Sequence, residues 1–321
     1  MNIKGGFCFI ATILEMKITL PVNITPTLRL EKATTQQIET IQKSLENKNH
    51  FGRPDRYYYE MQCKEKDKTL TSCSYEWEAL SEDNWRYYII SFKDMGLSAQ
   101  LLFSIANIIY PNLTSFLQYL TEEEYGLGEV NGTGKDNIGS TAFSFQLLKN
   151  PIAQTFDQEY LNNLQELFAK YNALNRNVHE SILRAIDFND SLRRLPQLTN
   201  LPVLGLFIII EMLLTHNPND REIGDSLNHQ IKTKMAFISP RLNKPLDYSL
   251  FDSSLASDKV WSTLYEYRSC IAHGNHIDFT KGRLKNLKDA NTAFDFLNAA
   301  TKSLLAHAII EPDVINGLKP I

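Results

Sequence analysis

The stretch LPVLGLFIIIEMLL, Leu201–Leu214, is the longest apolar run in this chain of 321 residues. It holds one ionisable side chain, Glu211, among aliphatic and aromatic residues. The run is too short to cross a bilayer, because a spanning helix needs ~20 apolar residues. Asn200 and Pro202 are residue types typical of a helix start. The stretch therefore predicts a central helix that is buried on several sides.

Helical periodicity surrounds this stretch from about residue 156 onward. Apolar side chains recur at helical spacing in the segments 157–172 and 178–195, which predicts an amphipathic helix in each. Further helices are expected over 221–238, about 257–273 and about 284–310. Residues 151–321 are therefore expected to form an all-α helical bundle of five or six elements.

The first 150 residues mix strand-like and helix-like patterns. Aromatic and β-branched runs predict strands over 7–20, 57–64 and 84–93, and helical spacing predicts helices over 34–47 and 97–110. The segment 125–140 holds five of the chain's 14 glycines and is expected to be a flexible loop or a boundary. It is not a phosphate-binding loop, because Glu129 and Asp136 occupy positions where that motif needs Gly and Ser or Thr. Residues 1–150 are expected to form an α+β domain for sensing or partner binding.

Composition and charge exclude several classes of protein. With 43% hydrophobic and 22% charged residues, the chain resembles an ordinary globular protein. A net charge of −4 and a pI near 6.0 argue against a uniformly basic nucleic-acid coat, although a local basic patch remains open. The four cysteines form no CxxC pair, which favours a reducing cytoplasm, and no membrane partner is expected.

A second stretch, YEYRSCIAHGNH (Tyr265–His276), concentrates groups suited to phosphodiester chemistry. Arg268 and His273 lie five positions apart, which is about 140° around an unbroken helix. Gly274 and Asn275 favour a left-handed helix end, so His273 is expected in the last turn, where the chain bends most easily. An imidazole moves protons near neutral pH, and a guanidinium stabilises charge on phosphoryl oxygens. Together they can cleave RNA without a metal or a cofactor.

The segments LYEYRSCIAHGN (264–275) and GLFIIIEMLLT (205–215) resemble the HEPN superfamily, most closely its ApeA-like branch. The resemblance covers about residues 173–275, and an arginine, four residues and a histidine are the signature of that superfamily. It implies a HEPN-like helical domain with a metal-independent endoribonuclease site, formed by Arg268 and His273 and usually assembled from two protomers. It also implies a homodimer that acts on RNA as a toxin or an antiphage-defence effector, with an inhibitor or antitoxin protein as a further partner.

Further residues support this hypothesis. Ser269 occupies a position that is usually polar in the superfamily, and Asn275 helps to end the helix. Glu211 matches the acidic residue of the superfamily's apolar helix, where a buried carboxylate needs a cationic partner such as Arg268. Four basic residues that follow the motif are candidates for steering an RNA backbone: Lys281, Arg283, Lys285 and Lys288.

Simpler interpretations stand beside these. Arg268 and His273 are also suited to stabilising the negative end of a helix dipole, and the basic cluster is also typical of a solvated helix start. His276 is expected to be a surface loop residue, and Arg176 and His179 are expected to form a solvated contact between neighbouring turns. The sequence contains no cluster of histidine, cysteine and acidic residues that would predict a metal site.

The sequence therefore predicts an α+β domain followed by a HEPN-like helical domain that dimerises and cleaves RNA by attack of the 2′-hydroxyl. The alternative is a non-catalytic HEPN-like module, in which the same residues bind a partner and the chain acts as an adaptor.

Overall fold

The structure is a computed structural model that describes residues 4–46, 49–50, 53–54, 56–68, 73–94, 96–115, 117–135, 152–192, 195, 200–217, 226–252 and 255–319. The chain divides into two compact units, Met1–Phe168 and Ala169–Ile321. The division falls inside helix α5 (Gln158–Asn172). The boundary expected at residues 150–151 lies outside the described residues. As expected, a β-rich region precedes an all-helical region.

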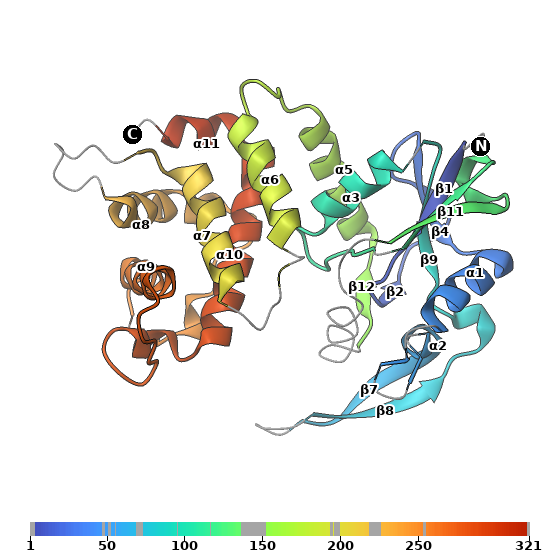
Figure 1. Ribbon diagram of the computed structural model, residues 1–321, viewed down its shortest axis with the longest axis horizontal. Helices are drawn as coiled ribbons and strands as arrows, with labels where there is room; N and C mark the ends of the chain where they lie inside the picture. Colours follow the sequence, from blue (N-terminus) through green and yellow to red (C-terminus); the bar gives the residue numbers. More distant parts are fainter. Residues whose placement is uncertain are drawn as a thin grey trace. The chain divides into compact units, whose positions relative to one another are not determined.

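The first unit is built on a six-stranded antiparallel sheet with the strand order β11-β10-β1-β9-β4-β3 (Figure 1). Its strands are β1 (Gly5–Phe9), β3 (Val22–Asn23), β4 (Leu28–Lys32), β9 (Tyr88–Phe92), β10 (Leu117–Thr121) and β11 (Val130–Lys135). Short pairs lie outside this sheet: β2 (Leu14–Met16) with β12 (Gln154–Phe156), and β5 (Asn49–His50) with β6 (Arg53–Pro54).

Both faces of the central strands are covered. Phe7 and Phe9 on β1 join one apolar cluster that includes Ile41 and Leu45 of helix α1 (Thr35–Glu46). The residue between the two phenylalanines, Cys8, is also buried and faces the other side of the sheet. Helix α3 (Leu97–Ala106) contacts β9, and Figure 1 shows α1 and α3 on opposite sides of the sheet.

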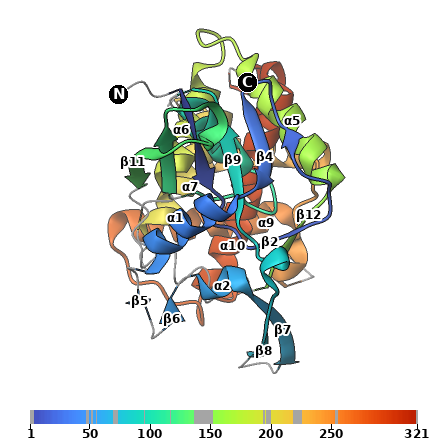
Figure 2. The ribbon, with the colours of Figure 1, turned by 90° about the vertical axis from the view of Figure 1, so that its right-hand side faces the viewer.

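Several local predictions for the first unit need correction. The segment 57–64 was expected to be a strand, but Tyr57–Glu60 forms a helical turn, α2, and the strand β7 runs from Met61 to Lys68. Strand β7 pairs with β8 (Cys73–Ala79), and the two form a separate hairpin that extends away from the six-stranded sheet (Figure 2). The glycine-rich segment was expected to be a loop, but Val130–Lys135 pairs with β10 as an edge strand. Four of its six residues are Asn, Gly or Thr, and an edge strand tolerates them because backbone hydrogen bonds with β10 hold it.

The second unit has six α-helices among its described residues. They are α6 (Glu180–Leu192), α7 (Leu201–Leu214), α8 (Leu227–Ile238), α9 (Ser257–His273), α10 (Ala290–Ile310) and α11 (Pro312–Leu318). The last long helix was expected to begin near residue 284, but Leu284–Leu287 is a 3-10 turn and α10 begins after its Asp289 cap. The side chain of Asp289 accepts a hydrogen bond from the Thr292 backbone N–H at 2.8 Å. Helix α11 was missed, because its seven residues are too few to show a clear period.

Helix α7 is the centre of the helical unit, as its apolar sequence predicts. It contacts α6, α8, α9, α10 and α11, and Phe207, Ile209, Ile210, Leu213 and Leu214 are fully buried. Gly205 allows α6 to approach closely, because a Cβ atom there would lie 2.1 Å from the Leu192 side chain. None of the helices in the described part of the chain is long and apolar enough to cross a membrane.

Candidate functional site

Helix α9 ends where the sequence predicts. Gly274 adopts a left-handed conformation with φ 66° and ψ 23°. The Asn275 N–H donates to the Cys270 carbonyl at 2.9 Å, and the Gly274 N–H donates to the Ile271 carbonyl at 3.2 Å. These two bonds form a Schellman motif, which satisfies carbonyl groups that a helix end otherwise leaves free. His273 is therefore the last residue of a regular helix, and its side chain is exposed.

Arg268 lies one turn and a half earlier and faces the central helix. Its Nη2 lies 3.4 Å from Oε1 of Glu211 on α7, and both side chains are largely buried, with 25% and 18% of their area exposed. The guanidinium also lies 5.6 Å from the centre of the Tyr265 ring. The prediction that a cation partners Glu211 is confirmed. Arg268 is thus fixed by an acid and an aromatic ring.

The environment of Glu211 perturbs its ionisation. Burial raises the pKa of this carboxyl group, and the nearby Arg268 charge opposes that rise. Its Oε1 atom is buried and accepts no hydrogen bond within the described parts of the chain, so the contact with Arg268 is an ion pair of loose geometry. Burial also raises the pKa of the Tyr265 hydroxyl, while the Arg268 charge lowers it.

Arg268 and His273 do not share a face within one chain. Helix α9 is regular through both residues and turns only after His273, so the two side chains stay about 140° apart around its axis. His273 makes no hydrogen bond or ion pair with any residue that the structure describes. One protomer therefore presents a fixed arginine on one side of the helix and an exposed imidazole at its end.

The other candidate residues surround this helix end. Ser269 is partly buried and Asn275 is exposed, where its backbone closes the helix. Lys281 lies 3.5 Å from Asp278, and Arg283 lies 3.7 Å from Glu266 on α9. Lys285 and Lys288 are exposed and have no carboxylate partner among the described residues. His276 is exposed in the loop after α9, as expected.

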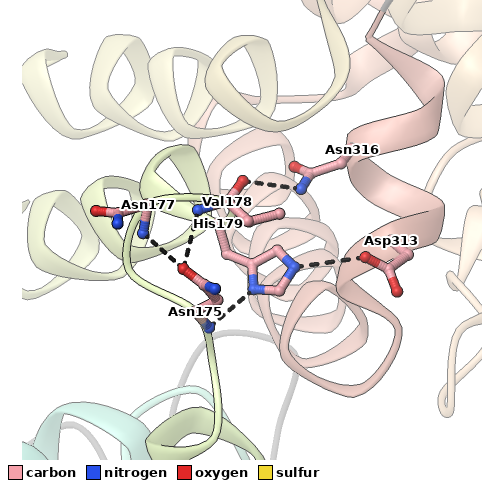
Figure 3. A network of polar contacts seen from close by, with 6 residues as sticks. All are labelled: Asn175, Asn177, Val178, His179, Asp313 and Asn316. Carbon is pink, nitrogen blue, oxygen red and sulfur yellow. Dashed lines mark hydrogen bonds and ion pairs between the residues drawn. The ribbon is translucent and has the colours of Figure 1, made fainter.

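One histidine departs from its prediction. His179 was expected to make a solvated contact with Arg176, but it is buried at the start of α6 (Figure 3). Its Nδ1 accepts a hydrogen bond from the Asn175 N–H at 3.2 Å, so the ring proton resides on Nε2, which lies 3.5 Å from Asp313 Oδ1. Both ring nitrogens are occupied, which leaves no free base for catalysis. No local sequence pattern predicts this contact, because Asp313 is 134 positions away.

The site has no sign of a metal centre: within the described ranges, no group of three His, Cys, Asp or Glu residues is placed to bind an ion. Comparisons with protein-family models, with curated proteins and with solved structures found no match for this chain.

Proposed function

We propose that the chain is a metal-independent endoribonuclease whose site combines Arg268 of one protomer with His273 of a second copy. The observation that carries the proposal is the arrangement on α9: a positioned, partly buried arginine and an exposed imidazole, about 140° apart. Because a single helix separates the two groups, a two-fold pair of helices is the simplest way to bring them to one phosphate. The resemblance of this segment to the HEPN superfamily supports the same assembly.

The chemistry needs only these two groups. His273 accepts the proton of a 2′-hydroxyl, whose oxygen then attacks the adjacent phosphorus. The bond from phosphorus to the 5′-oxygen breaks, and the imidazolium returns its proton to that leaving oxygen. The products are a 2′,3′-cyclic phosphate and a 5′-hydroxyl, with no water consumed. Arg268 stabilises the charge that develops on the phosphoryl oxygens.

Glu211 is a positioning residue in this scheme. Its loose ion pair with Arg268 orients the guanidinium and uses few of the five N–H donors that the group carries. The remaining donors can bind a phosphate. Lys285 and Lys288 are free of carboxylates in the described structure and are suited to attracting the RNA backbone toward the end of α9.

The biological role follows from the resemblance alone. A ribonuclease of this kind acts as a toxin or an antiphage-defence effector in the cytoplasm, and an inhibitor or antitoxin protein restrains it. The β-rich unit is the part available for sensing or for binding that partner.

The test is cleavage of tRNA and mRNA in EDTA by the wild type, Arg268→Ala and His273→Ala, with His276→Ala as the matched histidine control. We expect each of the first two changes to lower the rate by about 10²-fold or more, and His276→Ala to leave it unchanged. The wild-type products should carry cyclic phosphate and 5′-hydroxyl ends. Equal residual activity in all four proteins would overturn the proposal.

One observation favours the adaptor alternative: Arg268 already has a carboxylate partner inside its own chain. In that case Arg268 stabilises the contact between α7 and α9, and the helix end binds a partner without cleaving it. RNA binding by the wild type without any cleavage, together with a lower melting temperature for Arg268→Ala, would favour this alternative.

A further inference from the structure

A cavity of about 440 Å³ lies in the helical unit, between the first turns of α6 and α8, the end of α7 and the residue that follows α11. Its volume falls in the range of ~300–1,000 Å³ that is common for small-ligand sites. Figure 1 shows these four helices grouped together in this unit. The lining comes from these four segments and not from α9, which carries Arg268 and His273.

Side-chain contacts fasten α11 to the start of α6 (Figure 3). The Asn316 Nδ2 donates to the Val178 carbonyl at 3.1 Å. His179 Nε2 lies 3.5 Å from Asp313 Oδ1. Lys319 follows Asn316 by three residues, and its backbone N–H donates to the Asn316 carbonyl at 3.4 Å. Because three residues make about one helical turn, these contacts hold Lys319 near the first turn of α6.

A second wall of the cavity is also fixed by hydrogen bonds. Gln230 of α8 is buried, and its side-chain oxygen accepts from the His216 backbone N–H at 3.0 Å. Its side-chain nitrogen donates to the His216 carbonyl at 3.3 Å. The Thr215 hydroxyl donates to the Glu211 carbonyl at 2.9 Å. The segment that follows α7 is therefore held in place, and two carbonyl groups at this negative helix end already have donors.

The two acids of the lining are each paired with an arginine. Glu180 Oε1 lies 2.8 Å from Arg184 Nη2, one turn further along α6. Glu211 Oε1 lies 3.4 Å from Arg268 Nη2 and is itself buried. Both carboxylates are thus balanced by a guanidinium. The charge that remains in the lining is the ammonium group of Lys319.

This ammonium group has no counter-charge within the described parts of the chain. The Lys319 side chain is partly buried and forms no ion pair or hydrogen bond with any described residue. Burial lowers the pKa of its ammonium group. A partly buried cation without a partner is costly, and an anion in the cavity would lower that cost.

The first turn of α6 adds hydrogen-bond donors to the same cavity. The backbone N–H groups of Glu180 and Ser181 donate no hydrogen bond to a described residue. They are the first two residues of the helix, where such N–H groups lack a partner inside the helix. The Ser181 hydroxyl is also without a partner in the described structure. These donors favour an anion, as does the positive end of the helix dipole.

We propose that this cavity binds a small organic monocarboxylate, whose oxygens contact the Lys319 ammonium group and the donors at the start of α6. A single negative charge matches the one unbalanced ammonium group, whereas a phosphate dianion would bring a second charge close to Glu180 and Glu211. Met212 and Leu227 supply apolar surface for the rest of the molecule. The proposal does not rest on the ribonuclease function, since none of these contacts involves RNA.

Binding is tested by calorimetry and thermal shift on the full chain without RNA. The probes are sodium butyrate and sodium benzoate, at an ionic strength kept constant with sodium chloride. The matched controls are butyramide and benzamide, which keep the shape of each probe without its charge. We expect a carboxylate to bind at millimolar concentration or below, and its amide to bind about tenfold or more weakly.

Four variants place the ligand. Lys319→Met should weaken binding by about tenfold or more, and Lys319→Arg should retain most of it, because the positive charge is kept. Ser181→Ala should weaken binding by about fivefold, the effect of one lost hydrogen bond. Lys232→Met changes a partly buried lysine of α8 outside the lining and should have no effect. In NMR spectra of the wild type, the amide signals of Glu180 and Ser181 should shift as the carboxylate is added.

The absence of binding by both carboxylates at millimolar concentration would overturn the proposal. So would equal binding of a carboxylate and its amide, or full retention of binding by Lys319→Met. Tighter binding of inorganic phosphate or GMP than of either carboxylate would show that the cavity is a phosphate site instead. Because cleavage is not measured, failure here is distinct from failure of the ribonuclease.

Discussion

Arg268 on α9 lies 3.4 Å from Glu211 on α7, so the arginine of the candidate site is paired with the single ionisable residue of the central apolar helix. An ionised carboxylate is costly in such a helix unless a cation lies close to it. The pair therefore links the fold to the site: the same contact that makes Glu211 tolerable in the core sets the direction of the Arg268 side chain.

The first prediction tests whether the site is shared between two copies. Arg268→Ala and His273→Ala are each expected to be inactive, but a mixture that exchanges subunits should regain activity. A mixed dimer has one site with both changes and one site with neither. Random exchange therefore restores about a quarter of wild-type activity, because half of the dimers are mixed and half of their sites are intact. The measurement is cleavage rate after denaturation and joint refolding.

The control for this experiment is a mixture of Arg268→Ala with a protein that carries both changes, which should stay inactive. If the Arg268→Ala and His273→Ala mixture also stays inactive while exchange is shown by mass spectrometry, each protomer uses its own pair and the shared site is wrong.

The second prediction concerns the ionisation of Glu211. Its pKa is raised by burial, so the folded state binds the proton more tightly than the unfolded state. Protonated Glu211 stabilises the folded state fully at pH values below its pKa in the unfolded chain, which is near 4.5. This stabilisation is lost as the pH rises through the higher pKa of Glu211 in the folded protein. The free energy of unfolding of the wild type should therefore fall relative to Glu211→Gln over this window. The loss is about 1.4 kcal/mol for each unit by which the pKa is raised.

Urea unfolding of the two proteins at a series of pH values between about 4 and 8 gives this difference. Arg268 remains in both proteins. Loss of its ion pair with Glu211 changes the size of the difference in the free energy of unfolding, whereas the pH dependence of that difference comes from the ionisation of Glu211. If the difference in the free energy of unfolding between the two proteins did not change with pH, the raised pKa of Glu211 would be wrong.

The sequence predicts those features that depend on local patterns. The apolar run of α7 predicts a central helix, and Gly274 with Asn275 predicts the end of α9 to the residue. The buried state of His179 could not be predicted, because it depends on Asp313, 134 positions away in the chain. The edge strand at Val130 pairs with the strand that precedes it, but its glycines concealed it, because glycine is depleted in strands. The α2 turn was missed because Tyr57, Tyr58 and Tyr59 favour strands, yet here the tyrosines pack on Trp77, Phe9 and Tyr87.

The third prediction concerns His307 on α10, which is buried and whose Nε2 has no hydrogen-bond partner within the described ranges. Burial lowers its pKa, Glu311 opposes this, and Arg241 adds to it. The folded state favours the neutral ring. The neutral ring therefore stabilises the protein at pH values above the pKa of His307 in the unfolded chain, which is near 6.5. This stabilisation is lost as the pH falls through the lower pKa of His307 in the folded protein. Wild type should therefore lose stability relative to His307→Leu as the solution is acidified below about 6.5.

Chemical unfolding at pH 7.5, 6.5 and 5.5, followed by circular dichroism, measures this loss. His229→Leu is the control, because His229 is exposed on α8 and its removal leaves the burial of His307 unchanged. Parallel curves for the wild type and His307→Leu across these pH values would show that the ring does not titrate differently in the folded state.

The last prediction concerns the end of α9. Gly274 has φ 66° and open space around its Cα, so an added methyl group meets no neighbour and only the left-handed backbone is penalised. Gly274→Ala should destabilise the helical unit by about 1–2 kcal/mol, and Gly274→Asn by less, because asparagine tolerates this conformation.

Gly317 is the matched control: it lies in α11 with open space around it and no positive φ, so Gly317→Ala should be neutral or stabilising by about 0.5–1 kcal/mol. Since His273 is held by the same helix end, Gly274→Ala should also lower RNA cleavage more than Gly317→Ala does. Equal stability for the two alanine variants in urea unfolding would mean that the left-handed turn does not fix this end of the helix.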